Sequence, residues 1–184
     1  MINTDYPIEV WKLLLNRDCL GERYAPLILY RDVLLAELPS LGCRRKNDAA
    51  ALPDEGYLRI GLPDAETVRL FRKFLTIYDP GPLKFREIDK VVSDPEERAA
   101  YRELYHLPGV KAIRASLYYR SGYRSLRDFT KTTVEEVRDR TAQTIAELSL
   151  SCIVPLPKEV RTQIAVARAF LWEETERGTG SAEE

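Results

Sequence analysis

Leu107-Pro108-Gly109-Val110-Lys111-Ala112-Ile113-Arg114-Ala115, continued to Gly122 and then Tyr123-Arg124-Ser125-Leu126-Arg127-Asp128-Phe129, is the stretch that decides the fold. Pro108 and Gly109 are typical of a tight turn. We expect Gly109 to adopt a left-handed backbone and to leave little room for a Cβ atom. The apolar residues that follow have helical spacing, and they are Val110, Ile113, Leu117 and Tyr118. Gly122 then predicts the end of that helix.

Capping residues on both sides of this stretch predict further helices. Asp94 followed by Pro95 and two glutamates indicates a helix that runs into the turn. Ser125 with Asp128, and Thr133 with Glu136, have the spacing of a capping box. The predicted order is therefore helix, tight turn, helix, glycine, short helix and a longer helix.

This order resembles the helix-hairpin-helix motif, and more specifically the hairpin in the fingers subdomain of family X DNA polymerases. That family has a Gly-apolar-Gly turn, a small residue facing the first helix, and a glycine before an apolar-Lys-Thr-Leu-x-Asp-Leu segment. The corresponding residues here are Gly109-Val110-Lys111, Ala115, Gly122 and the segment 123–129. A continuation through a last helix extends the resemblance to about residues 95–172.

The resemblance implies a site that holds the backbone phosphates of DNA or RNA without reading bases. The amides at the start of the second helix would face a phosphate, and basic side chains would add to the affinity. The expected nucleic-acid-binding residues are Gly109, Val110, Lys111, Ile113, Arg114, Arg120 and Arg124. The resemblance also implies that the carbonyls of Tyr105, Leu107 and Val110 could surround a monovalent cation.

Charge is distributed unevenly along a chain whose net charge is only −1. Residues 98–131 contain eight basic and two acidic side chains, which gives this segment a net charge of +6. Five of the ten tyrosines lie between residues 101 and 123. They could stack on bases or pack in the core of the hairpin.

The remaining periodicity predicts an all-α protein with a helical N-terminal half. Helices are expected at 7–15, 26–38, 64–78 and 83–92, with a loop at 40–56 and a short extended piece at 57–60. Pro155 and Pro157 precede a last helix that carries Val160, Ile164, Ala167 and Leu171 on one face. We divide the chain into an N-terminal region (1–92), a helix-hairpin-helix domain (93–174) and a disordered acidic tail (175–184). The boundary is expected at Asp79–Pro82 or near Ser93.

The sequence contains none of the spacings that support a catalytic or metal site. It lacks a glycine-rich phosphate loop, a His-x-x-x-His pair and a nucleophile elbow. Cys19, Cys43 and Cys152 are far apart and read as free thiols, and His106 is the only histidine. We therefore expect no enzyme activity, no metal and no cofactor. With neither a signal peptide nor a membrane-spanning run, we expect a cytoplasmic protein without a membrane partner.

Two functions remain open at this stage, and an enzyme whose site lies between the two halves ranks third behind them. The first is binding to nucleic-acid backbone through the hairpin. The second is a protein-interaction or structural module with a degenerate hairpin, because Lys111 stands where the family has the second glycine of the turn. A side chain at this position crowds the approach of a phosphate, although a lysine also contributes positive charge.

Overall fold

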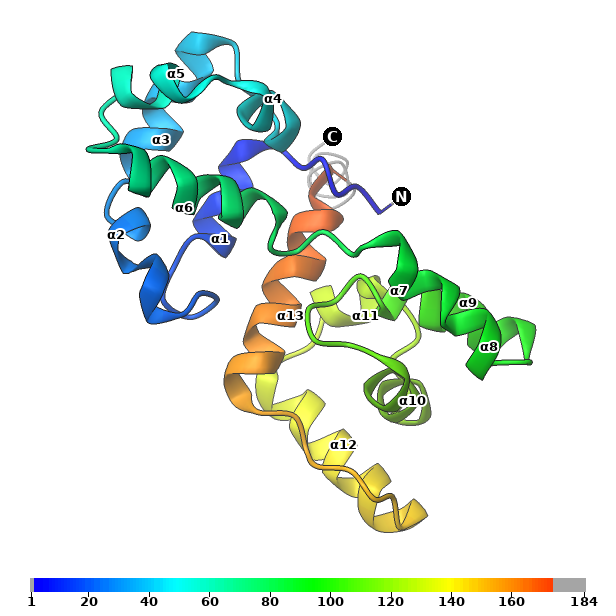
Figure 1. The fold of residues 1–184 in the computed structure, drawn as a ribbon. Helices are drawn as coiled ribbons and strands as arrows, with labels where there is room; N and C mark the ends of the chain where they lie inside the picture. The colour runs from blue at the N-terminus through cyan, green and yellow to red at the C-terminus, as the bar shows by residue number, and fades with distance from the viewer. Residues whose placement is uncertain (1, 174–184) are drawn as a thin grey trace, which may run out of the picture. The chain divides into compact units, whose positions relative to one another are not determined.

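The computed structural model describes residues 2–173, and in this part of the chain the all-α prediction is confirmed (Figure 1). The helices are η1 (Ile8–Val10), α1 (Trp11–Leu14), η2 (Glu22–Tyr24), α2 (Ala25–Ile28), α3 (Arg31–Glu37), η3 (Leu38–Leu41), α4 (Lys46–Ala51), α5 (Asp54–Arg59), α6 (Ala65–Thr76), α7 (Pro82–Arg86), α8 (Ile88–Val91), α9 (Pro95–Leu104), α10 (Ala112–Arg120), α11 (Leu126–Thr130), α12 (Val134–Leu148) and α13 (Pro157–Phe170). The only β pairing among residues 2–173 is an isolated bridge between Pro7 and Arg45.

Residue contacts divide the chain into two compact units. The first unit contains the chain up to Ile77 and the chain from Ala169 onward. The second unit contains Tyr78–Arg168. The division therefore falls just before Asp79–Pro82, and α7 and α8 belong to the same unit as the turn between α9 and α10. The predicted acidic tail, 175–184, lies outside the described residues.

Aromatic side chains form the core of the first unit. Trp11 and Phe71 meet edge to face with ring centroids 5.2 Å apart, and Tyr57 contacts the same Phe71 ring at 5.1 Å. Phe74 lies one turn further along α6, 6.0 Å from Phe71. These rings are almost fully buried, so they fix α6 against α1 and α5.

The prediction of a loop at 40–56 and an extended piece at 57–60 is wrong, because α4 and α5 occupy most of this region. The carboxylate of Asp48 accepts hydrogen bonds from the backbone amides of Arg44 and Arg45. These bonds fix the start of α4. The buried Tyr57 hydroxyl donates to the Ala49 carbonyl and thereby connects α5 with α4. These two contacts stabilise helices in a region where Gly42, Pro53 and Gly56 had indicated a loop.

Two predicted helices are interrupted in the structure, and a third begins as a 3-10 helix. The 7–15 region is a short 3-10 helix followed by α1, the 26–38 region breaks at Leu29 and Tyr30, and the 83–92 region breaks at Glu87. Hydrophobic spacing identified the buried faces but not these breaks. No helix in residues 2–173 is long and apolar enough to cross a membrane.

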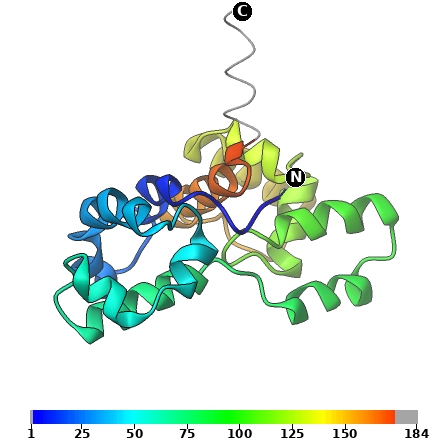
Figure 2. The same ribbon diagram turned by 90° about the horizontal axis from the view of Figure 1, so that it is seen from above.

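The predicted caps in the second unit are confirmed. Asp94 accepts the Glu97 amide at 2.8 Å at the start of α9, and the reciprocal Ser125–Asp128 box begins α11. Thr133 caps α12 by accepting a hydrogen bond from the Glu136 amide. The reciprocal half of the predicted box is replaced by another contact, in which the Glu136 carboxylate accepts from the Thr132 hydroxyl at 2.9 Å. The chain turns back after α8, so α8 and α9 are neighbours (Figure 2), and α9 also packs on α10. The small Ala115 on α10 is fully buried.

Candidate nucleic-acid interface

The segment between α9 and α10 is a tight turn with one left-handed residue. Gly109 has a φ of +74°, and the Val110 amide donates to the Leu107 carbonyl at 3.3 Å. Leu107 and Val110 are fully buried, so the turn is anchored on both sides of Gly109. The left-handed backbone that we expected is present, but the expectation of little room is wrong. A Cβ built on Gly109 meets no atom within 4 Å.

The backbone amides in the first turn of α10 point out of the N-terminal end of the helix, and no side chain caps them. Lys111 is the N-cap, with an extended backbone and no capping hydrogen bond from its side chain. The first amide bonded to the preceding turn is that of Ala115, which donates to the Lys111 carbonyl at 2.8 Å. The first amides of a helix have no intrahelical acceptor and attract anions. The Lys111 side chain is exposed beside them.

Lys84 binds backbone carbonyls at the turn between α9 and α10. Its ammonium donates to the Tyr105 carbonyl at 2.6 Å and to the Leu107 carbonyl at 3.3 Å. Burial, followed by the charge of Lys111, lowers the pKa of Lys84. Two of the three carbonyls that we expected to surround a monovalent cation are therefore bound by a side chain. Sequence reasoning missed Lys84, which lies more than 20 positions before both carbonyls and belongs to no motif.

Arg114 is directed toward α13 instead of toward the open side of the turn. Its guanidinium contacts both carboxylate oxygens of Glu159, at 3.0 and 3.2 Å, and donates to the Ile153 carbonyl at 2.9 Å. The side chains of Arg114 and Glu159 are only 17% and 25% exposed. A phosphate would reach this arginine only after displacing Glu159.

The other basic side chains of the +6 segment are also largely engaged. Arg124 pairs with Glu96 at 2.7 Å, and Arg120 donates to Ser116 at 3.2 Å. Arg98 and Arg102 share the carboxylate of Asp89, at 3.7 and 2.9 Å. The local positive charge is therefore smaller than the sequence count indicates. Of the predicted basic residues, Lys111 and Arg120 are the exposed ones for which the described residues supply no ion pair.

The tyrosines of this segment are mainly core residues. Tyr101, Tyr105, Tyr118 and Tyr123 are at most 4% exposed. The Tyr118 hydroxyl donates to Gln163 Oε1 at 2.6 Å, and Gln163 Nε2 donates to the Pro108 carbonyl at 3.0 Å. Burial raises the pKa of Tyr118 and, to about 12, that of Tyr101. These rings hold the turn in place and do not form a platform for stacked bases.

An apolar hollow of about 370 Å³ lies beside α10 in the same unit. Its lining includes Val91, Ile113, Leu117, Leu150 and Cys152. Ile113, whose amide we expected to face a phosphate, has a side chain that is 73% exposed. The face next to the turn therefore presents an aliphatic surface in addition to backbone amides.

In the described residues no group of histidine, cysteine, aspartate and glutamate side chains has the geometry of a metal site. His106 Nδ1 contacts the Arg102 and Glu103 carbonyls, and burial is the main cause that lowers the pKa of its ring. Comparisons of the chain with protein-family models, curated proteins and solved structures found no match. The function must therefore be argued from the geometry of the site.

Proposed function

We propose that the turn between α9 and α10 binds the phosphate backbone of DNA or RNA without base specificity, and that the protein is not an enzyme. The observation that carries this proposal is the uncapped start of α10 directly after the left-handed Gly109, with Lys111 exposed at the N-cap. Consecutive amides after a left-handed residue form a concave anion site. The open space around Gly109 allows an oxygen to approach the backbone.

The proposed affinity is low, because one turn neutralises few phosphates. With Arg114 and Arg124 bound to carboxylates, Lys111 and Arg120 supply most of the charge. The logarithm of the binding constant should fall with the logarithm of salt concentration with a slope of about −1 to −2, at roughly −0.9 for each phosphate neutralised. Contacts to phosphates carry no base information, so sequence should not matter.

The test is a titration of fluorescent duplex and single-stranded oligonucleotides, each at two salt concentrations. Lys111→Glu should abolish binding while far-UV circular dichroism stays unchanged. Lys90→Glu is the matched control, because Lys90 is an exposed lysine of α8 in the same unit and lies outside the turn. Equal weakening by both variants would mean that binding depends on overall charge and not on the turn.

The apolar hollow supports a second candidate, a protein-interaction module. Exposed Val91 and Ile113 lie at this hollow, and contiguous apolar surface of this kind is typical of interaction sites. Absence of oligonucleotide binding at low salt would favour this candidate. In that case Ile113→Ser should reduce binding of a protein partner, whereas Lys111→Glu should have a smaller effect.

A further inference from the structure

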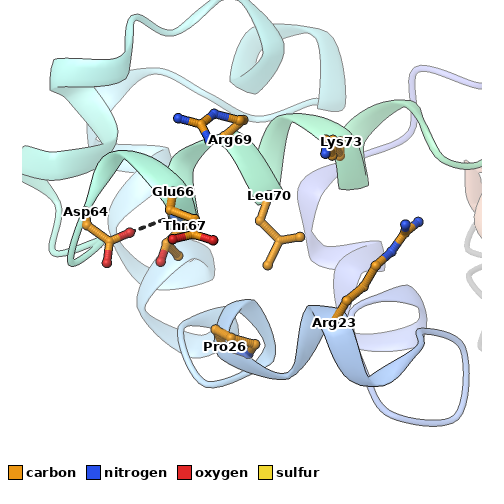
Figure 3. Close-up of a pocket in the computed structure, with 8 residues that line it drawn as sticks. All are labelled: Arg23, Pro26, Asp64, Glu66, Thr67, Arg69, Leu70 and Lys73. Atoms are coloured by element: carbon orange, nitrogen blue, oxygen red, sulfur yellow. Dashed lines mark hydrogen bonds between the residues drawn. The ribbon is translucent and has the colours of Figure 1, made fainter.

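A second hollow, in the first unit, lies between α6 and the segment formed by η2 and α2 (Figure 3). Its volume is about 450 Å³, within the range of small-molecule sites. Leu70 of α6 and Pro26 of α2 lie on opposite sides of it, and together they provide an apolar middle section. Nothing in the hairpin proposal uses these residues.

The two ends of this hollow carry opposite charges. Figure 3 shows Asp64 and Glu66 at one end of α6, and Lys73 toward the other end with Arg23 on the facing segment. Glu66 and Lys73 are seven positions apart, which is about 10 Å along the axis at 1.5 Å per residue. They are too distant to pair with each other, unlike Glu136 and Arg140 of α12, which meet at 2.6 Å.

Within residues 2–173, no ion pair neutralises the charges at the basic end. The ion pairs formed among residues 2–173 do not include Arg23, Arg69 or Lys73. Arg23 is held in place by the buried Tyr24, with its guanidinium carbon 4.9 Å from the ring centroid and a nitrogen 3.3 Å from the hydroxyl. Figure 3 shows Arg69 on the side of α6 away from Pro26, so the basic end consists of Arg23 and Lys73.

The acidic end is equally well positioned. The Asp64 carboxylate caps α6 by accepting the Thr67 amide at 2.7 Å, and this hydrogen bond lowers the pKa of Asp64. The exposed Glu66 stands next to it in the first turn of α6. Because α6 is anchored by the aromatic core, the backbone positions of Glu66 and Lys73 stay at a fixed separation along this helix.

We propose that this hollow binds an extended zwitterion whose opposite charges are about 10 Å apart, the class to which tripeptides with free termini belong. The ammonium of the ligand lies at Glu66 and Asp64, its carboxylate lies at Arg23 and Lys73, and its middle part contacts Leu70 and Pro26. The ligand is defined by charge separation and not by side-chain identity. This inference is independent of the hairpin, which belongs to the other unit.

Isothermal titration calorimetry of the full chain with trialanine tests the proposal. We expect affinity on the order of millimolar, because the contacts are few and exposed. Trialanine with both termini blocked should not bind. Glu66→Gln and Lys73→Gln should each weaken binding about tenfold. Arg59→Gln is the matched control, because Arg59 is an exposed arginine of α5 in the same unit that does not line the hollow.

Circular dichroism of each variant checks that the fold is retained, which is expected because Glu66 and Lys73 are exposed. Three results would overturn the proposal. They are no heat of binding with trialanine at ~10 mM, equal binding of the blocked peptide, and binding of inorganic phosphate at the basic end without binding of trialanine. The last result would reduce the hollow to a simple anion site.

Discussion

Replacement of Lys84 by methionine should destabilise the second unit through the turn between α9 and α10. Methionine retains most of the aliphatic stem but removes the ammonium that donates to the Tyr105 and Leu107 carbonyls. The Leu107 carbonyl also accepts the Val110 amide, so it keeps a partner. The Tyr105 carbonyl loses the shorter of the two bonds, at 2.6 Å.

The size of the effect follows from this difference between the two carbonyls. A buried carbonyl without a partner costs about 1–3 kcal/mol. Methionine also removes the cost of keeping a partly buried charge, the burial that lowers the pKa of Lys84, and solvent access weakens the remaining electrostatics. We therefore expect Lys84→Met to lower the free energy of unfolding by about 1–2 kcal/mol.

Urea denaturation followed by far-UV circular dichroism measures this change. Trp11 lies in the first unit, and so does Trp172, the other tryptophan. Tryptophan fluorescence therefore reports the first unit and serves as an internal reference. Lys90→Met removes an exposed lysine of α8 and should change stability by less than about 0.5 kcal/mol. If Lys84→Met and Lys90→Met are indistinguishable, the ammonium of Lys84 does not stabilise the turn.

Three further predictions concern the same unit. Burial lowers the pKa of His106 below its usual 6.5, so the folded state favours the neutral ring. This contribution to stability is fully present above pH 6.5 and is lost as the pH falls below 6.5 through the lower pKa of the folded state. His106→Gln should reduce the difference between urea midpoints measured above and below pH 6.5. Gly109→Val should cost about 1–3 kcal/mol through the positive φ alone, and Gly109→Asn, which tolerates that φ, should melt closer to the wild type. Gln163→Leu should lower the melting temperature more than Tyr118→Phe does, because the amide of Gln163 connects both the Tyr118 hydroxyl and the Pro108 carbonyl.

Local signals explain why much of the helical architecture was predictable. The caps at Asp64, Asp94, Ser125 and Thr133 act on residues three positions away, so a short stretch of sequence contains both partners. The left-handed backbone of Gly109 is likewise a local property. These features can be identified without knowing what else the chain contacts.

Features that depend on distant contacts could not be predicted in this way. Helices α4 and α5 depend on the Tyr57 hydroxyl reaching Ala49 and on Arg72 donating to the carbonyls of Ala50 and Leu52 at the end of α4. Local composition in this region, with two glycines and one proline, indicates a loop. The zwitterion site was missed for a similar reason, since Arg23 and Lys73 are 50 positions apart and meet only through packing of α2 on α6.

The charge of the hairpin segment shows how far a sequence count can mislead about function. The segment has a net charge of +6 when its own residues are counted, but the carboxylates that neutralise it come from outside or from its edges. Glu159 binds Arg114, Glu96 binds Arg124, and Asp89 binds both Arg98 and Arg102. Each pair reduces the number of counterions that nucleic acid could release on binding. Affinity for a phosphate backbone would therefore come from the amides at the start of α10 and from Lys111 and Arg120, which have no carboxylate partner among the described residues. Lys111 is the one of these two that lies at the turn, which makes Lys111→Glu the variant that separates the two proposed functions.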